Sequence, residues 1–93
     1  MIASFKDKHT SRVWKGEKTN KWSFDIQRTA LRKLFLIHAA GNINDLKIPP
    51  GNNLHKLKGD MENYWAIKIN DQWRIVFKWI DNNAHAVEIV DYH

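Results

Sequence analysis

The spacing of apolar residues predicts one long helix in the first half of the chain. From Ser23 to about Ala40, apolar residues recur at intervals of four, four and three positions, which is the period of one helix face. Ser23 is a suitable N-cap, and Gly41 with Asn42 marks the end of the helix. The apolar stripe consists of Ile26, Ala30, Leu34 and Ile37.

A shorter polar helix is predicted over residues 6–15, because Gly16 is a common stop signal. Residues 16–21 then read as a loop. A helical turn is expected over residues 44–46. The prolines and glycine of residues 49–53 mark a turn.

Beyond that turn the hydrophobic period becomes two, which is typical of strands. Trp73, Ile75, Phe77 and Trp79 share one face and should pack on the long helix, while Arg74, Val76 and Lys78 point away from it. A first strand is expected at the start of the chain, in residues 1–5. The later strands are expected at residues 54–57, 64–69, 73–80 and 84–90.

These elements predict an α+β fold in one domain that spans residues 1–93. The expected order is β-α-α-β-β-β. The turns between the later strands are short, which favours antiparallel neighbours. We therefore expect a curved, mainly antiparallel sheet with two helices packed on one face.

The composition excludes several chemistries. The chain has no cysteine, so it has no disulfide, no thiolate zinc site and no cysteine nucleophile. Its five histidines lack the spacing of a zinc site, and we expect no metal and no cofactor. No signal peptide and no apolar stretch of roughly 20 residues is evident, so we expect a cytoplasmic protein without a membrane association.

The net charge of +5 favours polyanionic partners such as RNA, DNA or an acidic protein. Arg28, Arg32 and Lys33 lie largely off the apolar stripe of the long helix and should form an exposed basic edge. Trp14 and Trp22 flank the loop between the helices. They either stay exposed for base stacking or pin the two helices onto the sheet.

Acid-base and cationic side chains gather at the chain end and in two strands. RNA cleavage without a metal needs a base, an acid and cations, because the RNA supplies its own 2′-OH as nucleophile. The same inventory would also suit a phosphate-binding surface without turnover. The candidate residues are His55, Lys58, Arg74, Asp91, Tyr92 and His93.

Each candidate also has a structural explanation. His55 could be a partly buried strand histidine. Strict alternation places His55 and Lys58 on opposite faces of the sheet, unless the strand ends or bulges at Lys58. Arg74 lies in an apolar strand and needs a partner, either phosphate or a carboxylate. The carboxylates considered are Glu62, Glu88 and Asp91. The terminal residues could be a frayed tail.

Several runs together resemble the HigB-type (host inhibition of growth) toxins of the bacterial RelE/ParE superfamily. The runs are Met1-Ile2-Ala3-Ser4-Phe5, Leu54-His55-Lys56-Leu57-Lys58-Gly59-Asp60, Tyr64-Trp65-Ala66-Ile67, Asn70-Asp71-Gln72-Trp73-Arg74-Ile75 and Asp91-Tyr92-His93. The resemblance covers nearly the whole chain and implies a RelE-like fold.

The resemblance also implies a function. It implies the toxin of a type II toxin-antitoxin system, a ribosome-dependent endoribonuclease that cleaves messenger RNA and inhibits translation. Its partners would be the ribosome, mRNA and a cognate antitoxin encoded nearby, with operator DNA bound only through the antitoxin. The six candidate residues would form the site.

Two other functions remain open at this stage. A gyrase-poisoning toxin of the same superfamily would share the fold, and fold does not determine function. Such a toxin has no use for the proton-transfer groups. A non-catalytic module that binds nucleic acid or an antitoxin is the second alternative.

Overall fold

The computed structural model describes residues 1–92, and the predicted helices are present in it. Helix α1 spans Lys8–Lys15, and Gly16 ends it in the left-handed conformation. Helix α2 spans Phe24–Ala39, and the Ser23 hydroxyl accepts the Ile26 N–H at 3.3 Å as its N-cap. The buried side of α2 includes the predicted stripe residues Ala30, Leu34 and Ile37. None of the helices in residues 1–92 is both long and apolar enough to cross a bilayer.

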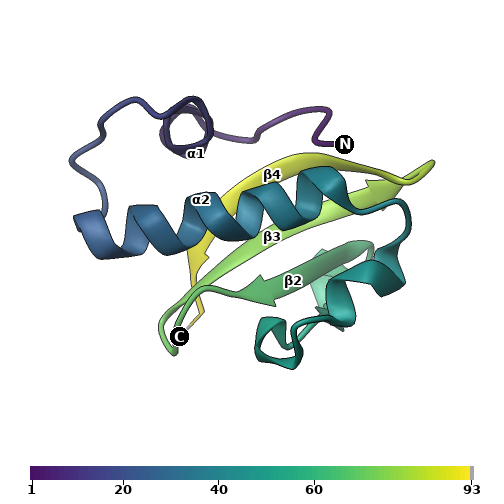
Figure 1. Ribbon diagram of the computed structural model, residues 1–93. Helices are drawn as coiled ribbons and strands as arrows, with labels where there is room; N and C mark the ends of the chain where they lie inside the picture. The colour runs from purple at the N-terminus through teal and green to yellow at the C-terminus, as the bar shows by residue number, and fades with distance from the viewer. Residues whose placement is uncertain (93) are drawn as a thin grey trace.

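A four-stranded antiparallel sheet in the order β1-β2-β3-β4 forms the second layer. Its strands are β1 (His55–Lys56), β2 (Tyr64–Lys68), β3 (Trp73–Ile80) and β4 (Asn83–Asp91). Three short 3-10 turns, Ile43–Lys47, Pro50–Asn52 and Gly59–Met61, occupy the connections before and after β1. Figure 1 shows α2 lying across the sheet, with α1 beside it on the same side. The α+β fold with helices on one face is confirmed.

The core lies between α2 and the sheet, as the strand pattern predicts. Ile75 and Phe77 are fully buried in one cluster with Leu34 of α2, and Trp73 and Trp79 pack against that cluster. Alternation along β3 therefore places the side chain of Arg74 on the opposite, open face of the sheet. Thus β3 delivers the core on one side and a candidate site residue on the other.

The start of the chain differs from the prediction, because residues 1–5 do not form a strand. They make only two isolated parallel bridges to β4, at Ile2 and Phe5. Between these bridges the Ser4 hydroxyl accepts the Ala86 N–H at 2.9 Å, and Ala86 has a positive φ of 52°. A side-chain contact thus replaces a regular hydrogen bond between strands. The first regular element of the fold is therefore a helix.

Strand β1 is also shorter than the predicted residues 54–57. Pairing with β2 covers only His55 and Lys56, and the chain then turns at Gly59, whose φ is 70°. Because the strand ends at Lys56, strict alternation does not extend to Lys58.

The tryptophans near the loop are structural. Trp22 is buried and meets Trp73 edge-on, with 6.3 Å between ring centroids. Trp14 packs against Phe35 and His38. Of the two alternatives, pinning the helices to the sheet is therefore correct, and an exposed Trp22 is wrong.

Lys33 is not part of an exposed basic edge, which corrects the prediction for α2. Its side chain is buried, and its ammonium donates to the Asn52 Oδ1 at 2.5 Å. Asn52 in turn donates through its Nδ2 to the carbonyl of Leu46 at 3.2 Å. Lys33 thus anchors the segment that leads into β1, and Arg28 and Arg32 remain as the exposed cations.

Because Lys33 is buried, the stability of the fold should depend on pH at this position. Burial lowers the pKa of Lys33 below its ordinary value of 10.5, and Arg32 lowers it further. Between the lowered pKa and 10.5 the unfolded chain holds more protons than the folded chain, so stability rises with pH in that window. The free energy of unfolding of the natural chain, relative to Lys33→Met, should therefore increase toward pH 10.5.

Urea unfolding of both chains from about pH 7 to about pH 10.5 measures this difference. Taking the difference between the two chains isolates the contribution of Lys33. A difference that stays constant with pH would contradict a buried ammonium at Lys33.

Candidate active site

Four of the candidate residues, His55, Arg74, Asp91 and Tyr92, lie toward one end of the sheet, where β4 ends beside the turn between β2 and β3 (Figure 1). The strand register aligns His55 with Ala66 and Val76, and Lys68 with Arg74 and Val90. Residues paired in register share a sheet face, so His55 and Arg74 both belong to the open face. The helices lie on the other face.

His55 and Tyr92 contact each other directly, although 37 residues separate them in the chain. The His55 Nε2 lies 3.1 Å from the Tyr92 hydroxyl, and the two rings meet edge-on with 5.8 Å between centroids. The His55 Nδ1 lies 2.8 Å from the backbone carbonyl of Asn53. Because a carbonyl only accepts, Nδ1 carries a proton, and in the neutral ring Nε2 keeps its lone pair. The geometry thus presents the basic nitrogen of His55 toward Tyr92.

Arg74 lies against the other side of this pair. Its guanidinium carbon is 4.4 Å from the centroid of the Tyr92 ring, within the range of a cation–π contact. One terminal nitrogen donates to the backbone carbonyls of Asn70 and Trp73. The sequence left open whether the partner of Arg74 is a phosphate or a carboxylate. The partners seen in the structure are two backbone carbonyls and an aromatic ring.

The Nε of Arg74 is buried and has no hydrogen-bond partner within residues 1–92. A buried donor without a partner is rare and costs free energy, so its presence needs an explanation. The contacts of the guanidinium with the two carbonyls and the Tyr92 ring hold Arg74 in place despite this cost.

Lys68, the register partner of Arg74, is engaged elsewhere. Its ammonium lies 2.8 Å from the carboxylate of Asp71 in the adjacent turn. The hydrogen bond and charge of Lys68 hold the pKa of Asp71 below its ordinary value. This exposed pair contributes little to stability. It does leave Arg74 as the buried cation beside Tyr92.

The turn between β2 and β3 fastens the end of the chain. The backbone carbonyl of Gln72 accepts the Tyr92 N–H at 2.7 Å, and the Gln72 side-chain amide donates to Asp91 at 3.1 Å. The Asn70 side chain accepts the N–H groups of Gln72 and Trp73 at 2.9 and 2.8 Å. The same turn thus positions Arg74, Asp91 and Tyr92, and the residues up to Tyr92 are not a frayed tail.

Lys58 stands apart from the contacts described so far. Lys58 is exposed in the segment that follows β1, just before the turn Gly59–Met61. It follows the same strand that carries His55. His93 lies outside the described residues.

Sequence reasoning missed three residues that hold the site together, namely Asn53, Asn70 and Gln72. Asn70 could have been found, because asparagine side chains often accept backbone N–H groups two residues later in turns. Asn53 adopts a left-handed conformation with a φ of 48°, which asparagine tolerates. Gln72 had no local signal, since its partner Asp91 is 19 residues away.

The assembled group combines a nitrogen base, a phenol, a carboxylate and a held cation on an open surface. Such a set can move protons and neutralise a phosphate. No three potential metal ligands come together in the part of the chain that the structure describes.

The comparison with protein families identifies a relationship over nearly the whole chain. Residues 3–93 match the HigB-like toxin family, described as RelE-like toxins of the type II toxin-antitoxin system HigB. The chain is 37% identical to the endoribonuclease HigB of Proteus vulgaris over 94 residues, covering 100% of each. It is 34% identical to toxin HigB-1 of Vibrio cholerae serotype O1 over 85 residues, covering 90% of each.

Solved structures share the fold at lower identity. A mutant of YafQ from E. coli has a TM-score of 0.65 at 12% identity, covering 99% of this chain and 94% of the other. The YoeB-YefM complex from Staphylococcus aureus has a TM-score of 0.64 at 18% identity, covering 100% of this chain and 98% of the other. At these identities the likeness concerns the fold.

Proposed function

The chain belongs to the HigB-like family of type II toxins, and from this we propose that it stops growth by cutting messenger RNA held on the ribosome. As a member of this family it is an endoribonuclease toxin. The cluster of His55, Tyr92 and Arg74 is the observation that carries the proposal. Its contacts place the His55 Nε2, which accepts from the Tyr92 hydroxyl, and the Arg74 guanidinium around one exposed ring.

In the proposed mechanism the RNA 2′-OH attacks the neighbouring phosphorus. The 2′ oxygen loses its proton to a base and bonds to phosphorus, and the bond to the 5′ oxygen breaks. A 2′,3′-cyclic phosphate forms, and the leaving oxygen takes a proton from an acid. His55 is suited to the base because Asn53 holds the proton on Nδ1 and leaves Nε2 to accept.

Arg74 and Lys58 would neutralise the phosphate as negative charge builds up in the transition state. His93 would share the proton transfers with His55. Asp91, fastened by Gln72, would orient a cation or take a proton. Tyr92 would stack on or hydrogen-bond the substrate, since its ring is 47% exposed despite its contacts with His55 and Arg74.

The proposed dependence on the ribosome follows from the openness of this surface. The cluster lies on a sheet face at the edge of a small domain, where little surrounds a bound strand. Accurate alignment of the 2′-OH with the phosphate contributes much of the rate in such reactions. The ribosome would therefore hold the codon, and the toxin would act in the cytoplasm where translation occurs.

The test compares two substrates for the purified toxin. A message on programmed ribosomes should be cut rapidly, and the same message free in solution should be cut slowly, as measured by mapping RNA ends. Equal rates on both substrates would contradict the proposal. Double-strand breaks in DNA, in a parallel assay with gyrase, would instead favour the gyrase-poisoning alternative.

A further inference from the structure

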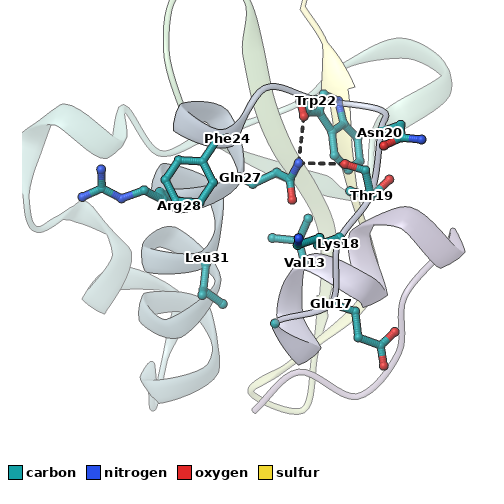
Figure 2. A pocket seen from close by; sticks show the side chains of 11 residues that line it. Val13, Glu17, Lys18, Thr19, Asn20, Trp22, Phe24, Gln27, Arg28 and Leu31 are labelled. Atoms are coloured by element: carbon teal, nitrogen blue, oxygen red, sulfur yellow. Dashed lines mark hydrogen bonds between the residues drawn. The ribbon is translucent and has the colours of Figure 1, made fainter.

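A groove of about 580 Å³ opens on the helix side of the sheet, between α1, the following loop and the first half of α2 (Figure 2). It does not include any residue of the proposed catalytic cluster. The residues that matter for its chemistry are Val13, Lys18, Trp22, Phe24, Arg28 and Leu31.

The groove has apolar walls. Figure 2 shows Phe24, Arg28 and Leu31 of α2 on one side, with Val13 and Lys18 facing them. The side chain of Phe24 is 72% exposed, the largest exposed fraction of any aromatic residue among residues 1–92. A large apolar side chain left in water beside a concave apolar surface is typical of a protein contact.

The groove also presents a polar atom. The Gln27 amide donates to the carbonyls of Thr19 and Trp22 at 2.9 and 2.7 Å, which leaves its Oε1 turned toward the groove (Figure 2). This oxygen offers an acceptor to a segment bound in the groove.

The charge of the rim is mainly positive. Lys18 and Arg28 flank the groove, Lys21 and Arg32 lie nearby, and Glu17 is the one acidic residue among its lining residues. The Arg28 guanidinium lies 5.8 Å from the Phe24 ring, which places a cation directly beside the exposed apolar surface. A partner that presents apolar side chains next to a carboxylate matches this arrangement.

We propose that the groove binds an amphipathic, acidic segment of the antitoxin. This inference rests on the proposed function, since a type II toxin has an antitoxin partner. RNA fits the groove less well, because few cations face its apolar walls and a strand needs cations spaced along its phosphates. Binding of ribosomal RNA in the groove is therefore treated as the alternative that the experiment must distinguish.

The experiment measures the affinity of the toxin for its purified cognate antitoxin. Phe24→Ser and Arg28→Glu change the groove, and Phe35→Ser and Lys47→Glu are matched controls at exposed positions outside it. Each groove variant should weaken binding about tenfold or more, since hot-spot residues have effects of this size. The controls should bind as the natural chain does.

Calorimetry without RNA separates this test from the proposed function, because binding is measured whether or not the toxin cleaves. Melting temperatures establish that each variant is folded. Equal affinities for groove variants and controls would overturn the proposal. So would variants that bind the antitoxin normally but bind ribosomes about tenfold more weakly, because the groove would then contact RNA.

Discussion

Replacing Arg74 with alanine should lower the rate of cleavage on the ribosome by about 10²–10³-fold, the size expected when one transition-state donor is removed. The guanidinium is held by two carbonyls and the Tyr92 ring. That arrangement fixes a positive charge beside the exposed ring, where the proposed phosphate would bind. Single-turnover cleavage of a message on programmed ribosomes measures the loss.

The same substitution should cost only about 1–2 kcal/mol of stability, the net value of one or two hydrogen bonds. The Trp73 carbonyl keeps the Ile69 N–H at 3.0 Å, and exposed Asn70 can bind water. Lys78→Ala is the matched control, because it removes a cation from the same strand and face at the far end. Wild-type cleavage by Arg74→Ala would remove this residue from the site.

Further variants, at Arg74 and in the turn that holds it, test whether the position of Arg74 matters as well as its charge. Arg74→Lys keeps the charge but loses the planar fork, so most of the activity should still be lost. Asn70→Leu removes the side chain that accepts the Gln72 and Trp73 N–H groups, and it should lower cleavage by about tenfold. Asn70→Asp retains the acceptor and should restore most of that loss.

Replacing His55 with glutamine should lower cleavage by about 10²–10⁴-fold, the range for loss of a general base or acid. Glutamine has a donor and an acceptor but exchanges no proton near neutral pH. The half-buried His55 contacts Asn53 and Tyr92 through hydrogen bonds, and neither contact lies in the core. Its melting temperature should therefore change little.

Tyr92→Phe is the matched variant for the same pair. It keeps the ring beside Arg74 and the edge contact with His55 but removes the hydroxyl at 3.1 Å. If the ring acts mainly by stacking, Tyr92→Phe should retain far more activity than Tyr92→Ala. Unimpaired cleavage by His55→Gln would shift the proton transfers to His93, Asp91 and Lys58.

Local pattern was sufficient for the helices and for the two faces of β3. The apolar period of α2 and the alternation of Trp73 to Trp79 are properties of the backbone, so they hold wherever the element packs. The Ser23 cap and the Gly16 stop are also local, because each acts within one turn of its own residue. Arg74 could be placed on the open face for the same reason.

The predictions that proved wrong concern residues whose structure depends on contacts between distant segments of the chain. Residues 1–5 have the composition of a strand, but the Ser4 hydroxyl bonds to Ala86 and interrupts the ladder. Lys33 belongs by its chemistry to an exposed edge, but the loop after α2 brings Asn52 within 2.5 Å of its ammonium. Neither partner is visible in local sequence, since each depends on the path of a loop.

The candidate site divides along the same line. The sequence by itself determined which side chains offer acid-base and cationic chemistry, because that is set by residue type. Only the tertiary structure brought His55 to Tyr92 and Arg74 to the Tyr92 ring. Strand register and the turn at Asn70 and Gln72 set these contacts, and both depend on how the successive strands pair with one another.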